Sequence, residues 1–311
     1  MQLKSHQECT DKIATVVFTI LGYLNIVFVA VICLYLVISG IPAIGQIGFV
    51  DFIFGTQWAS TASEPKFGIM PFILTSVYGT FGAILLGLPI GFFTSVYLAK
   101  FAPLKIKQFV ESTVDLLAGI PSVVFGFIGM LVLVPGIQYF FNVPDGSSLL
   151  AAILVLSIMI LPSIIKVSIG AIEAVPEEYE LGSLALGANK VETVYKVMVP
   201  AARRGIGVAV VLGVGRAIGE AMAVMMVAGN VANMPDLFES VRFLTTAVAS
   251  EMSYSAGLQR QALFSIALVL FVFIMIINAL LNLVLKERKG IFFFNDTATT
   301  EIYTSIMLFL A

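Results

Sequence analysis

Six apolar stretches, each about 20 residues or longer, limit most strongly what this chain can fold into. They run approximately over 13–39, 71–99, 116–141, 149–169, 206–228 and 262–285. A helix needs about 20 mostly apolar residues to cross the hydrocarbon core of a bilayer. The sequence therefore predicts an all-α fold, a polytopic membrane protein with six transmembrane helices.

Composition excludes the other broad classes of protein. Hydrophobic residues make up 59% of the 311 residues and charged residues only 12%, too few charges to cover a soluble domain of this size. Disordered chains need the opposite balance, and the strands of membrane barrels alternate rather than forming long apolar runs. The net charge of -2 gives no bulk attraction to nucleic acid, so we expect no nucleic-acid partner and a lipid bilayer as the surroundings.

The distribution of Lys and Arg predicts the orientation in the membrane. Both termini and the loops after the second and fourth stretches share one side. Only Lys66, Arg242 and Arg260 fall on the other side, and Arg216 falls within a stretch. The rest of the 17 Lys and Arg residues, Lys166 included, fall on the first side. Because cytoplasmic loops carry the excess of Lys and Arg, we expect a multi-pass protein of the cell (plasma or inner) membrane with both termini cytoplasmic.

Helix-breaking residues occur inside the stretches. They are Pro89, Pro121, Pro135 and Pro162, with two GxxxG pairs at Gly87 and Gly91 and at Gly215 and Gly219. Taken singly, such residues indicate kinks and close packing between membrane helices. Taken together, broken and glycine-rich helices favour a transporter that changes conformation over a rigid anchor.

The fifth stretch contains two charges, Arg216 and Glu220. Counted from Ile206, Arg216 lies about 15 Å along a helix, near the middle of a bilayer core about 30 Å thick. The i, i+4 spacing predicts that both side chains lie on one helix face. A guanidinium at this depth can hold a tetrahedral oxyanion through paired hydrogen bonds, and Glu220 would compete with the anion and tune its release. The alternative is a structural ion pair between the two.

No pattern for catalysis or metal binding is present. The chain lacks the GxxxxGK[ST] loop that binds nucleotide phosphates, so we expect it not to hydrolyse ATP by that route. Cys9, Cys33 and His6 have no zinc-type spacing. We therefore expect no catalytic residue, no metal and no cofactor in this chain.

A polar segment between the fourth and fifth stretches has its own helical pattern. Pro176 followed by acidic residues is typical of a helix start, Gly187 ends that helix, and a second helix over Lys190 to Met198 would stop at Pro200. An elbow of two short helices with an exposed apolar ridge is suited to docking a cytoplasmic partner. The alternative is a plain solvated connection.

This segment resembles the coupling motif of ABC-importer permeases, which reads E-A-A, three residues, G, nine residues, I-x-L-P. Gly187 stands at the glycine, and the I, L and P positions hold Val197, Val199 and Pro200. The E-A-A positions hold Leu181, Gly182 and Ser183, with Glu180 one place early. The resemblance implies that these residues form the loop through which a separate ATPase drives transport.

Further segments are similar to PstC-type permeases of phosphate ABC importers, from about Trp58 to Leu285. They are FGIMPFILTSVYGT, AGIPSVVFGFIGML, LGSLALGANKVETV and VGRAIGEAMAV. The resemblance implies the type I (MetI-like) permease fold and places Arg216 and Glu220 on the phosphate pathway. It implies as partners a PstA-type permease in a heterodimer, a PstB-type ATPase dimer that hydrolyses ATP with Mg, and a PstS-type phosphate-binding protein.

Other functions stay open at this point. A permease for another oxyanion or small solute, or the paralogous PstA-type subunit, would share most of these features. A stand-alone channel or secondary transporter belongs to a different class, and it would have no use for an ATPase-docking loop with Gly187 and Pro200. A purely structural or signalling subunit would not need Arg216 in the membrane.

The chain divides into two parts of different composition. We expect residues 1–290 to form the transmembrane domain, with a coupling loop at about 170–205. Residues 291–311 have no place in the six-helix topology, and Asn295 to Thr304 look like the translation of a common sequencing adapter. We therefore expect 291–311 to be a non-native tail.

Overall fold

The computed structural model describes residues 2–285, with the side chains of 15–281 and 283. The longer helices of this part are α1 (Gln2–Ile47), α3 (Met70–Lys100), α4 (Leu104–Gly119), α7 (Leu149–Glu173), α10 (Val199–Gly219) and α13 (Gly257–Leu285). The shorter helices are α2 (Phe49–Phe54), α5 (Ser122–Ile128), α6 (Val134–Phe141), α8 (Glu177–Ala185), α9 (Lys190–Thr193), α11 (Met222–Val227) and α12 (Leu244–Glu251). Two π-helical turns (Gly129–Leu133 and Val194–Met198) and an antiparallel hairpin of β1 (Trp58–Ala59) and β2 (Lys66–Phe67) complete these elements.

Six helical segments of the described residues are long and apolar enough to cross a membrane. They are Thr15–Ile47, Met70–Lys100, Ser122–Phe141, Leu149–Glu173, Lys190–Gly219 and Gly257–Leu281. Each corresponds to one of the six predicted stretches. The predicted all-α polytopic membrane fold is confirmed.

Helix α7 is the centre of the bundle. Its most apolar window is 61% buried, against 6–39% for the other spans, and it packs between α3 and α10. Gly87 and Gly91 of α3 allow the close approach, because a Cβ at either position would lie within 3 Å of Ile160 or Ile164 of α7. The close-packing interpretation of this first GxxxG pair is confirmed.

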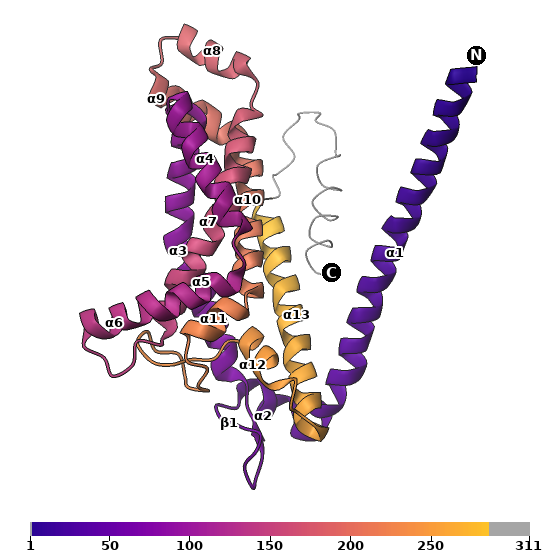
Figure 1. Cartoon of the computed structure of the whole chain (residues 1–311), viewed down its shortest axis with the longest axis vertical. Coiled ribbons are helices and arrows are strands. Elements are labelled where there is room, and N and C mark those ends of the chain that lie inside the picture. The colour runs from indigo at the N-terminus through magenta and orange to yellow at the C-terminus, as the bar shows by residue number, and fades with distance from the viewer. Residues whose placement is uncertain (1, 286–311) are drawn as a thin grey trace.

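Helix α1 stands apart from the bundle (Figure 1). Its window is only 6% buried, and in Figure 1 it slants away from the other helices towards its N-terminal end. Its main contact is with α13, where the Ser265 hydroxyl donates to the Gly40 carbonyl and the rings of Tyr35 and Phe264 meet edge to face. Most of the apolar surface of α1 is therefore left for lipid or another chain.

The four prolines differ in whether they interrupt a helix. Pro89 and Pro162 lie inside α3 and α7 without ending either helix. Pro121 separates α4 from α5 and adopts an extended conformation, and Pro135 begins α6 after a π-helical turn. The third predicted stretch, 116–141, is therefore wrong at its start, because the membrane-spanning part begins at Ser122.

Two expected boundaries near the polar segment are also wrong. Helix α7 continues to Glu173, past the predicted end of the fourth stretch at residue 169, so Lys166 lies well inside a helix. Pro200 does not stop the preceding helix; it lies in the first turn of α10, which follows α9 through the π-helical turn. The chain stays helical through this proline because the π-helical turn precedes it, where the Val199 amide donates to the Val194 carbonyl.

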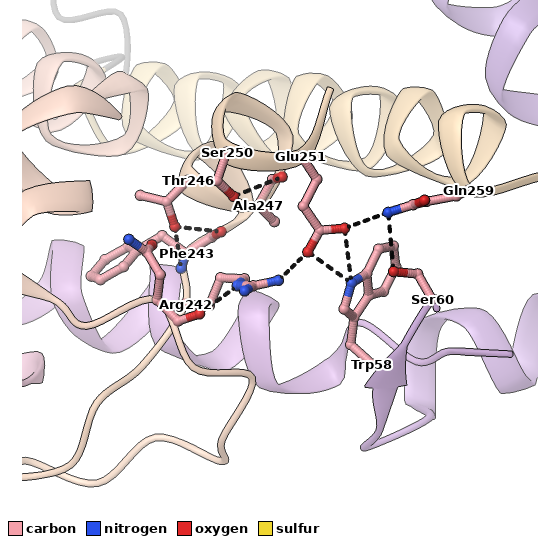
Figure 2. Close-up of polar contacts among 10 residues, drawn as sticks. Trp58, Ser60, Arg242, Phe243, Thr246, Ala247, Ser250, Glu251 and Gln259 are labelled. Carbon is pink, nitrogen blue, oxygen red and sulfur yellow. Dashed lines mark hydrogen bonds and ion pairs between the residues drawn. The ribbon is translucent and has the colours of Figure 1, made fainter. Parts of the chain in front are cut away.

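The hairpin, α2 and α12 gather at the end of the molecule opposite α8 (Figure 1). There Glu251, which is 7% exposed, joins three segments (Figure 2). Its carboxylate accepts from Trp58 Nε1 at 3.2 and 3.3 Å, from Arg242 Nη1, and from Gln259 Nε2 at 3.0 Å. Gln259 also donates to the Ser60 hydroxyl. A buried carboxylate with this many donors holds the hairpin against α12 and α13.

The expected tail over 291–311 lies outside the described residues. So does the end of the expected transmembrane domain, from residue 286 to residue 290. The coupling loop expected at about 170–205 is shorter than predicted, because α7 and α10 extend into that range from both sides.

Candidate functional site

A cavity of about 460 Å³ lies between α7, α10 and α13, with the end of α4 beside it. It adjoins Pro162, near the midpoint of the buried helix α7. Most of its lining is apolar, but two cationic side chains, a hydroxyl and an amide also face it. The lining residues are Ala118, Pro162, Ser163, Lys166, Val167, Val211, Leu212, Gly215, Arg216, Gly219, Ile274 and Asn278.

Arg216 lines this cavity from the last turn of α10. The carbonyl end of a helix favours a cation, so the local backbone helps to hold the guanidinium charge. The residue is half-buried, and within the described part of the chain its guanidinium forms no hydrogen bond or ion pair. A desolvated cation whose donors are not used by protein is suited to receive an anion.

Gly215 and Gly219 keep the space beside Arg216 open. A Cβ at either glycine would meet nothing within 4 Å, in contrast to Gly87 and Gly91. Within the described residues, the second GxxxG pair therefore does not form the helix contact that the packing interpretation predicts. These two glycines form part of the cavity wall there.

Glu220 does not lie on the helix face of Arg216. Helix α10 ends at Gly219, and Glu220 is extended, with φ -71° and ψ 126°. Its Oε1 accepts from the Ala223 amide at 3.0 Å, and its carbonyl accepts from the Thr245 hydroxyl at 2.9 Å. The expected shared helix face is wrong, because the carboxylate satisfies the free N–H groups at the start of α11. The same hydrogen bonds argue against the structural ion pair with Arg216.

Lys166 also lines the cavity, although its charge was expected among those on the cytoplasmic side of the membrane. Its ammonium pairs with the Asp115 carboxylate of α4, and both side chains are about half exposed (48% and 56%). A signal was present in the sequence: apolar residues continue past Lys166 in VSIGAI before the acid Glu173. A lone lysine inside such a run belongs to the helix and not to its end.

The expected elbow is formed by α8 and α9. Helix α8 follows Pro176, and Gly187 has φ +90°, which favours glycine and ends the helix. The predicted apolar ridge is exposed on this elbow, with Leu181 and Leu184 about half exposed and Leu186 92% exposed. An apolar ridge raised on a short helix is suited to enter a groove on another protein.

Helix α8 is attached to its neighbours at two points. The Lys100 ammonium, at the end of α3, pairs with the Glu180 carboxylate at 2.6 Å. The Ser183 hydroxyl lies 2.9 Å from that of Thr193 in α9. Glu180, one place before the motif position, therefore makes the ion pair that connects α8 to α3. A displacement of α8 would be transmitted to both α3 and α10.

Of the remaining motif residues, Gly182 lies in α8, and the others lie where the elbow continues into α10. Gly182 has open space around it, and Val197 and Val199 are half-buried at the π-helical turn and at the start of α10. Pro200 is exposed in the first turn of α10. Val197, Val199 and Pro200 are thus connected to Arg216 by one continuous helical segment, Lys190–Gly219.

The family model for binding-protein-dependent transport system inner membrane components matches residues 87–289. The chain belongs to this family of ABC-importer permeases. Solved structures agree on the fold. A chain of the MetNI methionine ABC transporter has a TM-score of 0.52 at 19% identity, covering 71% of this chain and 95% of that one. The predicted MetI-like permease fold is confirmed.

Curated relatives narrow the similarity within the family. The probable ABC transporter permease YqgH of Bacillus subtilis is 38% identical over 83% of this chain and 85% of its own length. The phosphate transport system permease PstC of Haemophilus influenzae is 32% identical over 91% and 95%, and that of Pasteurella multocida is 30% identical over 82% and 86%. The expected resemblance to PstC-type permeases is confirmed.

Proposed function

We propose that this protein is the PstC-type permease subunit of an ATP-driven importer of inorganic phosphate. The observation that carries the proposal is the Arg216 guanidinium in the cavity beside α7, which forms no hydrogen bond or ion pair within the described residues. Phosphate is a tetrahedral oxyanion, and a guanidinium binds such a group through two parallel hydrogen bonds. The similarity to several PstC phosphate permeases over most of the chain supports the same substrate.

In this mechanism Arg216 receives the anion near the middle of the membrane. The apolar walls strengthen its electrostatic attraction by excluding water. Contrary to the expectation, Glu220 does not compete with the anion for Arg216. It fixes the break between α10 and α11, so Arg216 stays at the end of a helix. A shift of this break would move the guanidinium and change its hold on the anion.

The energy for transport comes from ATP and Mg bound to a PstB-type ATPase dimer. The elbow would dock on that dimer through Leu181, Leu184 and Leu186, and Lys190–Gly219 would carry the movement to Arg216. A PstA-type permease would complete the pathway, and a PstS-type binding protein would deliver phosphate at the end that bears the hairpin and α12. This subunit has no ATPase site of its own. It lies in the cell membrane with both termini cytoplasmic.

Substitution of Arg216 tests the proposal. In membrane vesicles holding the assembled importer, Arg216→Ala should lower the initial rate of radiolabelled phosphate uptake at least 100-fold. Arg216→Lys keeps the charge but loses the planar pair of donors, so it should retain a small fraction of the rate. Basal ATP hydrolysis and co-purification of the partner subunits should be unchanged in both variants.

Competition identifies the substrate class. Unlabelled arsenate, which has the shape and charge of phosphate, should compete for uptake, and sulfate should not. Normal phosphate uptake by Arg216→Ala would reject the anion pathway. Stronger competition by sulfate than by arsenate would assign the permease to another oxyanion.

A further inference from the structure

A second cation faces the cavity that contains Arg216. Lys166 projects from α7, where Ser163 and Pro162 lie one turn earlier on the same helix face. Arg216 comes from α10, and Asn278 comes from α13. Within the described residues, Lys166 and Arg216 are the charged side chains that line this cavity. Together with the hydroxyl and the amide they supply donors from three helices.

Lys166 also lines a second, smaller cavity. This cavity, of about 200 Å³, is bounded by Glu111, Val114 and Asp115 of α4 and by Ile165, Lys166 and Ile169 of α7. The Lys166 ammonium pairs with Asp115 there. The lysine therefore stands in the wall between a cavity with two cations and a cavity with two carboxylates. Its long, flexible stem allows the ammonium to turn towards either one.

The charges of the two cavities would allow the Lys166 ammonium to exchange one partner, Asp115, for another, the anion held by Arg216. Phosphoryl groups carry about -1.5 to -2 charges near neutral pH, which a single guanidinium does not neutralise. An anion held by Arg216 would compete with Asp115 for the Lys166 ammonium. When Asp115 takes the ammonium back, the anion loses one of its two cations and its binding weakens.

We propose that Lys166 is a second anion ligand of the cavity, and that Asp115 releases the anion by recapturing the Lys166 ammonium. The proposal rests on the proposed function, since it concerns the same substrate and the same cavity. Lys166 would be a specificity residue that lies outside both the coupling motif and the fifth span. Divalent tetrahedral oxyanions are the substrate class that two cations would select.

Substitutions on either side of the ion pair should have opposite effects. In the assembled importer reconstituted in lipid, Lys166→Gln should reduce the amount of radiolabelled phosphate retained by the complex without ATP about tenfold. Asp115→Asn leaves the ammonium to the anion, so retention should increase. Both variants should lower the initial uptake rate at least fivefold, the first through weak binding and the second through slow release.

An ion pair between the same two helices provides the control. Lys107 of α4 pairs with Glu173 of α7, and neither residue lines the cavity of Arg216. Lys107→Gln removes an α4–α7 ion pair without touching the anion, so retention and uptake should stay within twofold of wild type. A similar loss in Lys107→Gln and Lys166→Gln would show that only helix attachment matters, and would overturn the proposal.

The charge-swapped variant Lys166→Asp with Asp115→Lys separates an anion ligand from a structural pair. It restores an ion pair between α4 and α7 but places a carboxylate in the wall beside Arg216. Phosphate retention and uptake should stay at least tenfold below wild type, and recovery to within twofold would reject the proposal. Arg216→Ala is measured in parallel: if it too takes up phosphate normally, the proposed function fails, whereas a defect in Arg216→Ala alone rejects only the role of Lys166.

Discussion

At Glu251 one buried carboxylate satisfies donors from three separate segments of the chain. Arg242, 17% exposed, supplies the opposite charge, and its guanidinium also lies over the Phe72 ring with 5.8 Å between the guanidinium carbon and the ring centroid. A buried charge of this kind is stable only while its partners stay in place. The network therefore fixes how the hairpin lies on α12 and α13 (Figure 2).

Glu251→Gln should destabilise this end of the molecule strongly. The amide leaves the Arg242 charge buried without a counter-charge and points an N–H group at other donors, a loss of about 3–5 kcal/mol. The midpoint of thermal unfolding, measured on the purified importer in detergent, should fall by several degrees. Glu239→Gln is the matched control, because Glu239 is exposed and should shift the midpoint little. Equal midpoints for the two variants would contradict the stabilising role.

At the scale of elements, the two GxxxG pairs differ in what faces them. Gly87→Ala would place a methyl group 2.7 Å from the Ile160 side chain and 2.9 Å from the Ser157 carbonyl, and such overpacking costs about 1–3 kcal/mol. Gly215→Ala would meet nothing within 4 Å. We expect a lower unfolding midpoint for the first variant and an unchanged one for the second.

In phosphate transport the same two variants should rank the other way, with Gly215→Ala as the impaired one. Gly215 lines the cavity of Arg216, so an added methyl group there should slow phosphate uptake by the folded importer. An unfolding midpoint that falls equally in Gly215→Ala would mean that this glycine packs against a helix after all.

Hydrophobic runs and loop charges were sufficient to predict the six spans and the elbow. Turn chemistry at Pro176 and Gly187 also predicted both ends of α8. The break after Gly219 was not predictable, because GEAMAV continues the apolar helical pattern through Glu220. What ends the helix is tertiary: the Thr245 hydroxyl holds the Glu220 carbonyl, and the carboxylate caps α11. Lys166 was missed as a cavity residue because its charge was counted with those of the cytoplasmic side.

At the scale of the whole molecule, the N-terminal end of α1 and the elbow lie at one end and the hairpin lies at the other (Figure 1). Single cysteines introduced at Leu186 and at Ser63, in a variant lacking Cys9 and Cys33, test the proposed orientation. Both positions are exposed. A membrane-impermeant maleimide should label Ser63→Cys in intact cells, with any outer membrane permeabilised, and Leu186→Cys only after the cell membrane is opened. The reverse labelling would place the elbow outside the cell.

The contact between α1 and α13 has a consequence for synthesis of the protein. Helix α1 packs on α13, which lies far later in the chain, through Gly40 and Ser265, and has little other contact with the bundle. Until α13 is inserted, α1 lacks this partner. Its docking is then a late step of assembly, and a chain released before α13 would hold α3, α7 and α10 correctly and still carry an undocked α1.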